Sequence, residues 1–384
     1  MRRVAVLGGS GSIGQQALSL IAAFPDSYQL VGLSVHRQLP KIQPWINQLN
    51  PAWIAITDEE TRRHSHSIFP TQKLIGIEEL YEKLATEPID IVINGIVGAA
   101  GFWASWYTLQ NPTARLALAN KESLVFGGQW LSVYRNRILP IDSEHSALFQ
   151  CLLGEKVEDV EKLILTASGG PFRGKKSADL SHITPSQALA HPVWRMGARI
   201  SVDSATLMNK ALELIEAYWL FGVPAEQIEV WVHPQCILHS MVLFRDGSFK
   251  AQLSYPDMRL PILYALSYPY RAPFTQKRWS PFLEGGTLTF EAVDEETFPT
   301  LTYAREALRI GGPAPALLNA TDEVAVEAFL QGRISFLDIF RWLEWTLTQP
   351  EVRLQPESPH GMEALEKAFR EKVQLHFLGK AHAK

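Results

Sequence analysis

The glycine-rich run Gly9-Ser10-Gly11-Ser12-Ile13-Gly14 constrains this chain more than any other feature of the sequence. It follows the apolar run Val4–Leu7 directly and precedes the helical pattern Gln15–Phe24. The glycines permit a tight turn and a close approach of the backbone to a ligand, and the start of a helix attracts a pyrophosphate. The run therefore predicts a strand, a turn and a helix that bind a dinucleotide. A glycine turn that simply closes a β–α unit is the alternative.

Short apolar runs alternate with helical patterns throughout residues 1–142. This alternation is typical of an α/β fold with a doubly wound parallel sheet. The expected strands are Val4–Leu7, Leu30–Leu33, Trp53–Ile56, Ile91–Ile93, Arg115–Leu118 and Ile138–Ile141, and the clearest helices are Gln15–Phe24 and Ile77–Ala85. The most apolar long stretch, Ile89–Tyr107, contains Asp90, Asn94 and three glycines. A buried strand followed by a glycine-rich turn explains this stretch better than a membrane span.

The rest of the chain divides into three regions. Residues 143–267 combine strand-like runs with one strong helix and predict an α+β domain; the runs are Leu163–Thr166, Glu229–Val232, His239–Phe244 and Lys250–Leu253, and the helix is Thr206–Phe221. Prolines recur within residues 268–297, which is typical of a linker. Residues 298–384 predict a C-terminal α-helical bundle with helices at Thr300–Ile310, Pro315–Leu330, Ser335–Thr348 and His360–Phe377.

The end of the second expected strand favours NADPH over NADH. An NAD enzyme usually carries Asp or Glu there, because the acid binds the ribose 2′-hydroxyl. This chain has His36-Arg37-Gln38 instead, without an acid. The guanidinium of Arg37 can pair with a 2′-phosphate, and His36 can assist it. The alternative is that Arg37 is a solvated surface charge.

Two carboxylates follow the last expected strand of the sheet, in Asp142-Ser143-Glu144-His145. Residues two apart at a strand end point the same way, so Asp142 and Glu144 can share one ligand. A carboxylate pair at the carboxyl end of a strand suits a hard cation such as Mg²⁺ or Mn²⁺. Capping of a helix that begins near Ser143 and an acid–base pair are the alternatives.

The strong helix carries further polar side chains. Asp203 or Ser204 is expected to cap its start. Asn209 and Glu213 are four residues apart on one face of the helix, and Lys210 lies close to Glu213. Ser204, Asn209 and Lys210 are donors that suit a phosphate, and Glu213 can serve as a third metal ligand. The alternative is an amphipathic helix with a surface Lys–Glu pair.

Two loops are candidates for ligand contacts. Ser168-Gly169-Gly170 follows a strand and offers a serine and bare backbone to a phosphate, although an ordinary turn explains it equally well. The loop His191–Gly197 contains Trp194 and Met196, which are costly in a loop unless they cover something. A lid over a ligand and packing against the core are the two interpretations.

The composition of the chain limits the kinds of molecule that it is expected to bind. The formal net charge of -4 gives no general affinity for nucleic acid or anionic membrane, so a local cluster of donors must hold any anionic ligand. The cysteines, Cys151 and Cys236, lack metal-ligand spacing, and two are too few for a disulfide framework, which fits a reducing compartment. His233 and His239 are expected to be satisfied core residues. The sequence enters its first strand without a signal-peptide or transit-peptide pattern, which predicts a cytoplasmic protein.

Together these segments resemble the 1-deoxy-D-xylulose 5-phosphate reductoisomerase family, and the resemblance covers almost the whole chain. The motifs that carry it are Gly8–Gly14, Ile96–Gly101, Leu118–Leu124, Pro140–His145, Ser168–Phe172, His191–Gly197, Ser201–Glu213, His233–Met241, Pro256–Met258 and Leu317–Ala320. It implies a Rossmann-like NADPH-binding domain (1–142), a catalytic and dimerising α+β domain (143–267), a linker (268–297) and a helical domain (298–384). The chain departs from the family at His36-Arg37-Gln38, where Gly-Lys-Asn is common, and at Cys236, where serine is usual.

The resemblance also implies roles for individual residues. The metal ligands would be Asp142, Glu144 and Glu213. The catalytic residues would be Lys121, Glu144 and His191. The substrate would contact Ser143, Ser168, His191, Trp194, Met196, Ser204, Asn209 and Lys210. The cofactor would contact Ser10, Gly11, Ser12, Ile13, His36, Arg37, Gln38, Asn120, Glu122 and Gly197.

The implied reaction rearranges 1-deoxy-D-xylulose 5-phosphate and reduces it to 2-C-methyl-D-erythritol 4-phosphate, with NADPH and Mg²⁺, Mn²⁺ or Co²⁺. The resemblance further implies a homodimer, a cytoplasmic bacterial-type enzyme without nucleic-acid or membrane partners, and binding of phosphonate hydroxamates such as fosmidomycin. Two alternatives stay open: another NADP-dependent dehydrogenase, of the semialdehyde or homoserine type, and a non-catalytic NADPH-binding sensor.

Overall fold

The structure is a computed structural model that describes residues 1–65, 68–69, 71–190, 197–274, 277–282 and 286–379. Its contacts divide the chain into two compact units. Unit 1 comprises Met1–Leu124, Leu131–Ser146 and Pro256–Lys277, and unit 2 comprises Val125–Trp130, Ala147–Tyr255 and Arg278–Lys384. The chain passes from one unit to the other within the helices α6 (Glu122–Leu131) and α7 (Ser143–Leu152), and again after Tyr255 and after Lys277.

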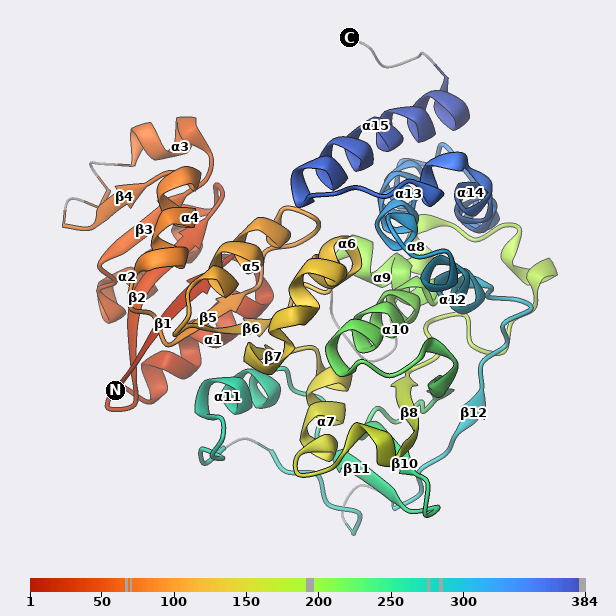
Figure 1. Cartoon of the computed structure of the whole chain (residues 1–384), viewed down its shortest axis with the longest axis horizontal. Coiled ribbons are helices and arrows are strands. Elements are labelled where there is room, and N and C mark those ends of the chain that lie inside the picture. Colours follow the sequence, from red (N-terminus) through yellow and green to blue (C-terminus); the bar gives the residue numbers. More distant parts are fainter. Residues whose placement is uncertain (66–67, 70, 191–196, 275–276, 283–285, 380–384) are drawn as a thin grey trace. The chain divides into compact units, whose positions relative to one another are not determined.

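Unit 1 is built on a seven-stranded parallel sheet with the strand order β4-β3-β2-β1-β5-β6-β7. The strands are β1 (Arg2–Leu7), β2 (Tyr28–Val35), β3 (Trp53–Ile56), β4 (Lys73–Ile75), β5 (Ile91–Asn94), β6 (Arg115–Leu118) and β7 (Ile138–Pro140). The helices are α1 (Ser12–Ala23), α2 (Gln43–Leu49), α3 (Glu59–His64), α4 (Ile77–Thr86), α5 (Gly101–Gln110) and α11 (Arg259–Ser267), and Figure 1 shows them around the sheet. The strand order reverses between β1 and β5, and ligands of such sheets bind at that point.

The sequence prediction of this sheet is confirmed for six strands, and strand β4 was not predicted. β4 has three residues and lies at the edge of the sheet, so its apolar signal is short. The apolar stretch Ile89–Tyr107 forms β5 and most of α5, as the strand interpretation requires.

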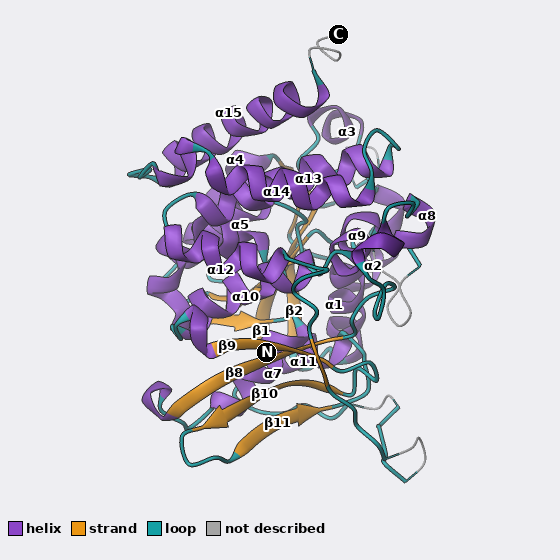
Figure 2. Cartoon of the chain, turned by 90° about the vertical axis from the view of Figure 1, so that its right-hand side faces the viewer, coloured by secondary structure: helices purple, strands orange, loops and turns teal. Residues whose placement is uncertain are grey.

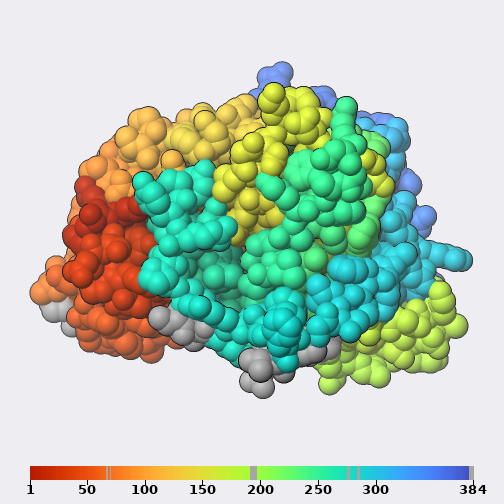
Figure 3. Space-filling model, turned by 90° about the horizontal axis from the view of Figure 1, so that it is seen from below, coloured from red at the N-terminus to blue at the C-terminus, as the bar shows by residue number. Residues whose placement is uncertain are grey.

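Unit 2 contains a mixed five-stranded sheet with the order β11-β10-β8-β9-β12. The strands are β8 (Val160–Ala167), β9 (Ile228–Val232), β10 (Leu238–Phe244), β11 (Phe249–Leu253) and β12 (Glu291–Ala292). Figure 2 shows β9, β8, β10 and β11 following one another in this order. Strand β11 has mostly exposed side chains, and the green and teal chain segment that contains it reaches the surface seen in Figure 3.

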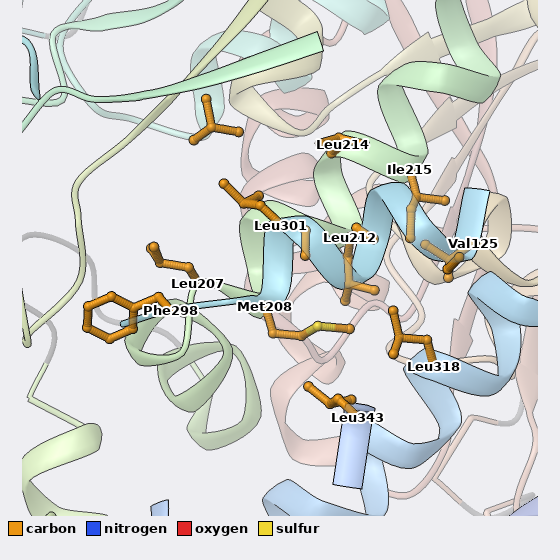
Figure 4. Close-up of a cluster of buried hydrophobic side chains, with 14 of the residues drawn as sticks. Val125, Leu207, Met208, Leu212, Leu214, Ile215, Phe298, Leu301, Leu318 and Leu343 are labelled. Carbon is orange, nitrogen blue, oxygen red and sulfur yellow. The ribbon is translucent and has the colours of Figure 1, made fainter. Parts of the chain in front are cut away.

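Helices supply the other layer of unit 2, and its core lies among them and against strands β8, β9 and β10. They are α8 (Pro185–Ala188), α9 (Ala198–Ala205), α10 (Met208–Phe221), α12 (Thr300–Ile310), α13 (Ala314–Leu330), α14 (Phe336–Thr348) and α15 (Pro359–Leu378). Figure 4 shows apolar side chains of α10 interleaved with those of α12, α13 and α14, among them Leu212, Leu301 and Leu318. The four predicted C-terminal helices are thereby confirmed. No helix among the described residues is long and apolar enough to cross a membrane.

Candidate active site

The glycine turn between β1 and α1 is as compact as its sequence predicts. Gly8 has φ +74°, and a Cβ there would lie 2.7 Å from the carbonyl oxygen of Gly95 at the end of β5. A Cβ on Gly14 would lie 2.4 Å from the oxygen of Gly8. The helix begins after Gly11, which has no side chain to cap it, so the first amide groups of α1 face an exposed turn. Such a turn fits the backbone cradle that a dinucleotide pyrophosphate requires.

Two residues outside the predicted site, Ser34 and Gln15, hold this turn. The hydroxyl of Ser34 in β2 accepts a hydrogen bond from the amide of Gly8 at 3.0 Å. Nε2 of Gln15 donates to the carbonyl oxygen of Gly9 at 2.7 Å. Their sequence signal is weak, because a serine in a strand and a glutamine in a helix are ordinary residues at such positions.

The residues expected to contact the adenosine end lie at the carboxyl end of β2. His36, Arg37 and Gln38 are all exposed. The guanidinium of Arg37 forms a salt bridge with Asp58, with Nη2 2.9 Å and Nε 3.0 Å from Oδ1. Asp58 follows β3 and was not predicted as a site residue. Arg37 is therefore an ordered cation at the position where the sequence predicts a contact with a 2′-phosphate.

Asn120 connects the loops after β5 and β6. Its buried Nδ2 donates to the carbonyl oxygens of Ile96 at 2.7 Å and Gly98 at 2.9 Å. The same Nδ2 lies 3.0 Å from Oε2 of Glu122. A Cβ on Gly101 would lie 2.6 Å from the side chain of Asn120, so glycine is required there. The two predicted cofactor residues Asn120 and Glu122 thus belong to one hydrogen-bonded group.

The carboxylates after β7 lie at the start of α7. Asp142 precedes this helix, and Ser143 and Glu144 form its first turn, with Ser143 Oγ donating to Glu144 Oε2 at 2.5 Å. Asp142 and Glu144 were expected to point the same way because they are two residues apart at a strand end. That reason was wrong, because β7 already ends at Pro140. Nζ of Lys121 lies 2.7 Å from Oδ2 of Asp142, and each side chain is 13% exposed. A lysine and two carboxylates are thus gathered at the carboxyl end of the sheet of unit 1.

The strong helix of unit 2 is interrupted. The sequence predicts one helix at Thr206–Phe221 with Asp203 or Ser204 as its cap, but residues 198–205 form a separate helix, α9. The break lies at Leu207, whose φ is +62°, and α10 starts at Met208 without a side-chain cap. The capping prediction was therefore wrong. The break places Ser204 at the end of one helix and Asn209 at the start of the next.

Glu213 is held by two donors of its own helix. Nδ2 of Asn209 donates to Oε1 at 2.6 Å, and Nζ of Lys210 donates to Oε2 at 2.5 Å. The contacts predicted from the helical spacing are thus present. Taken as whole residues, Lys210 is 4% and Glu213 is 1% exposed to solvent, which excludes the alternative of a surface pair. Removing two charges from water to bury them this deeply costs free energy, and such pairs are frequent at functional sites.

The glycine loop after β8 approaches the end of α9. Gly169 and Gly170 have φ values of +86° and +69°, and a Cβ on Gly170 would lie 2.5 Å from the carbonyl oxygen of Ser204. Ser168 Oγ accepts a hydrogen bond from the amide of Gly170 at 3.2 Å. The loop that carries Ser168 and the helix end that carries Ser204 are therefore in contact, as a shared ligand would require.

The predicted lid lies mostly outside the described residues. His191, Trp194 and Met196 belong to the segment 191–196, and the structure gives no account of them. Gly197 is described; it is exposed and precedes α9, and its carbonyl oxygen accepts a hydrogen bond from Ser201 Oγ at 3.1 Å.

His233, directly after β9, and His239, in β10, are buried and hydrogen-bonded, as expected of core residues. His233 donates from Nδ1 to the carbonyl oxygen of Thr289, 3.0 Å away, and its Nε2 accepts from the amides of Ile237 and Leu238. His239 lies 3.2 Å from the carbonyl oxygen of Ser254, and burial lowers its pKa to about 4.

A charged network joins α9 to the C-terminal helices. Arg199 of α9 donates to Oδ1 of Asn319 at 2.7 Å and to Oε1 of Glu323 at 2.5 Å, both on α13. The other oxygen of Glu323 binds Arg370 of α15. Burial raises the pKa of the adjacent Asp322 well above its ordinary value. The sequence gives no sign of this network, because Arg199 is 124 residues from Glu323, and Arg370 is a further 47 residues along the chain.

Family models match three stretches that together cover most of the chain. Residues 4–128 match the 1-deoxy-D-xylulose 5-phosphate reductoisomerase model. Residues 138–221 match the model of that enzyme's C-terminal domain, and residues 253–372 match a second model described as the DXP reductoisomerase C-terminal domain.

Curated relatives carry the same description. The 1-deoxy-D-xylulose 5-phosphate reductoisomerase of Geobacillus kaustophilus is 45% identical over 363 residues, which is 93% of this chain and 95% of the relative. That of Bacillus subtilis is 44% identical over 364 residues, or 93% of this chain and 94% of the relative.

Solved structures agree over the whole length. The reductoisomerase of Zymomonas mobilis in complex with NADPH has a TM-score of 0.91 at 37% identity, and the match covers 99% of each chain. A reductoisomerase in complex with NADPH, fosmidomycin and magnesium also gives 0.91, at 33% identity, covering 99% of this chain and 100% of the other. The α/β fold class with a parallel sheet and helical C-terminal region is thereby confirmed, and the chain belongs to the 1-deoxy-D-xylulose 5-phosphate reductoisomerase family.

Proposed function

We propose that this chain converts 1-deoxy-D-xylulose 5-phosphate to 2-C-methyl-D-erythritol 4-phosphate with NADPH and a divalent cation, in the non-mevalonate pathway to isoprenoid precursors. The observation that carries the proposal is family membership over nearly the full length. The two alternatives find no such support. A semialdehyde dehydrogenase needs a cysteine thiolate, and burial disfavours Cys151 for that role because it raises the pKa of its thiol to about 11.

NADPH fits the glycine turn of unit 1. The turn has no room for side chains at Gly8 and Gly14, so its backbone can approach the pyrophosphate. The proposed contacts are Ser10, Gly11, Ser12, Ile13, Asn120, Glu122 and Gly197, with His36, Arg37 and Gln38 at the ribose 2′-phosphate. Arg37 would hold that phosphate by charge-assisted hydrogen bonds.

The proposed ligands of the divalent cation are Asp142, Glu144 and Glu213. Their chemistry fits Mg²⁺ or Mn²⁺, with Co²⁺ as a further option, because hard cations prefer carboxylate oxygens. Lysine ammonium groups already contact Asp142 and Glu213, so both sites accept positive charge. A bound divalent cation supplies Lewis acidity, which polarises a carbonyl and acidifies a neighbouring hydroxyl.

The phosphate of the substrate is proposed to bind to unit 2. Ser168, Ser204, Asn209 and Lys210 are its donors, and Ser143 would contact the hydroxyl groups of the substrate. The contact between the Gly170 loop and Ser204 supports this assignment, because it brings two of the donors to one place. Binding energy at the unreactive phosphate can then position the reacting carbons.

The catalytic step is proposed to use Lys121, Glu144 and His191. Lys121 would lie between the substrate and the nicotinamide, where its ammonium can stabilise the developing oxygen charge. His191, Trp194 and Met196 would close over the substrate and exclude water from the reactive aldehyde that NADPH reduces.

The remaining assignments follow the family. We propose that residues 1–142 bind the cofactor, that residues 143–267 bind metal and substrate and form a homodimer, and that 268–297 link them to the helical domain 298–384. We further propose that the enzyme acts in the cytoplasm and binds fosmidomycin, as the related structure with this inhibitor suggests.

Oxidation of NADPH by the purified protein, followed by absorbance, tests the function. We expect turnover only when 1-deoxy-D-xylulose 5-phosphate and Mg²⁺ or Mn²⁺ are both present, inhibition by fosmidomycin, and loss of turnover with chelator. NADPH binding without turnover under these conditions would contradict the proposal and favour the sensor.

A further inference from the structure

The carboxyl ends of β2 and β3 continue side by side beyond the strands. Val35 pairs with Ile56 in the parallel ladder, and the amide of Thr57 donates to the carbonyl oxygen of Val35 at 3.1 Å. Past this point, in the part of the chain that the structure describes, side chains join the two loops. Nδ1 of His36 lies 2.9 Å from Oγ1 of Thr57, and Arg37 forms its salt bridge with Asp58. His36 and Arg37 thus each contact a residue after β3.

Asp58 is anchored from two sides. Its Oδ2 caps helix α3 by accepting from the amide of Thr61 at 3.0 Å and from the Thr61 hydroxyl at 2.6 Å. Its Oδ1 accepts from Arg37. The hydrogen bonds from Thr61, and then that from Arg37, hold the pKa of Asp58 well below its ordinary value. The carboxylate therefore stays charged and fixed beside the guanidinium of Arg37, whose side chain is 68% exposed.

We propose that Asp58 is a specificity-determining residue of the cofactor site, which weakens the preference for a 2′-phosphate over a 2′-hydroxyl by neutralising Arg37. The proposal rests on the proposed function in one respect, namely that Arg37 faces the ribose of the adenosine. It adds a residue that lies after the third strand, whereas the acid that binds the ribose hydroxyl in NAD enzymes ends the second.

The charge of Asp58 acts differently on the two cofactors. A 2′-phosphate must share Arg37 with a carboxylate that already accepts from Nε and Nη2, and it is repelled by the fixed negative charge. The 2′-hydroxyl of NADH has no charge to repel, and it can donate a hydrogen bond to a carboxylate. Removing the charge alone should therefore strengthen binding of NADPH and leave binding of NADH equal or weaker.

Asp58→Asn isolates this charge. Asparagine is as good a helix cap as aspartate, and its amide oxygen can still accept from Arg37. The dissociation constants of NADPH and NADH are measured by cofactor fluorescence, without substrate or metal, and those of adenosine 2′-monophosphate and adenosine 5′-monophosphate by competition. We expect the constant for NADPH to fall about three- to tenfold, less at high salt, and the ratio of NADH to NADPH constants to rise accordingly.

The matched control is Asp90→Asn. Asp90 precedes β5 at the amino end of the sheet and accepts from the amide of Arg3 at 2.7 Å, so this variant removes the same charge far from the cofactor end of the strands. It should leave both constants unchanged. Asp58→Ser also retains a capping hydroxyl and should shift them in the same direction as Asp58→Asn.

An unchanged ratio in Asp58→Asn, or weaker binding of NADPH, would overturn the proposal. The outcome is separable from that of the proposed reaction, because binding is measured without the substrate. A shifted ratio in a protein without turnover would support the role of Asp58 and contradict the reaction. Normal turnover with an unshifted ratio would do the reverse.

Discussion

Replacing Lys210 by methionine should destabilise unit 2, and replacing Glu213 at the same time should restore most of the loss. Nζ of Lys210 lies 2.5 Å from Oε2 of Glu213, and the two side chains are 5% and 2% exposed. Removing one member of a buried ion pair leaves an uncompensated charge, which costs about 3–5 kcal/mol. Replacing both members with neutral side chains of similar volume is often neutral.

The size of the effect follows from the contacts that remain. In Lys210→Met, Asn209 still donates to Oε1 of Glu213, so we expect the lower end of that range, about 3 kcal/mol. For a unit of this size the loss corresponds to a fall in Tm of roughly 6–12 °C. Adding Glu213→Gln to Lys210→Met should recover about 2 kcal/mol, because the unpaired charge is gone.

Thermal and urea unfolding, followed by circular dichroism in the presence of chelator, measure these differences. Lys162→Met is the control, since Lys162 pairs with Glu229 at the surface and the two side chains are 37% and 32% exposed. That variant should lose less than about 1 kcal/mol. A similarly small loss in Lys210→Met, or a double variant no more stable than the single one, would refute the reasoning.

Two further predictions concern the metal and the pH dependence of stability. Glu213→Gln should raise the Mg²⁺ concentration needed for half-maximal activity roughly tenfold or more, because ligand charge sets the affinity for hard cations; an unchanged Mg²⁺ titration would place the ion elsewhere. The pKa of His239 is about 4 in the folded protein against the ordinary 6.5, so the unfolded chain binds more protons between these values and stability falls as pH drops from 6.5 towards 4. The full contribution of His239 to the free energy of unfolding is about 3 kcal/mol, and it is present above pH 6.5. His239→Gln should therefore show a shallower loss of Tm over this pH window. An equally steep loss would assign the effect to other groups.

The fold was predictable wherever a hydrophobic pattern has one interpretation. Helix α12 starts and ends at the predicted residues, Thr300 and Ile310, because its apolar positions follow one regular face. The break at Leu207 was not predictable. A positive φ is normally signalled by glycine, and a buried leucine adopts it here only because tertiary packing compensates the strain.

Contacts between site residues could be predicted from the sequence within one helix, but not between two loops. The contacts of Asn209 and Lys210 with Glu213 follow from a spacing of four and three residues. The pairing of Arg37 with Asp58 depends instead on the register of two strands, and the strand periodicity does not specify which loop residues meet beyond their ends.

The network of Arg199, Glu323 and Arg370 bears on how shortened forms of the protein should be interpreted. Arg370 lies on α15, yet it reaches through Glu323 to Arg199, on the same short helix as Ser204. A truncation or fused tag that displaces α15 would also destabilise α9, which carries the proposed phosphate donor Ser204. Lost activity in such a form would not mean that the removed residues touch the substrate. A rise in KM with kcat retained would instead indicate that α15 stabilises the phosphate site without contacting the substrate.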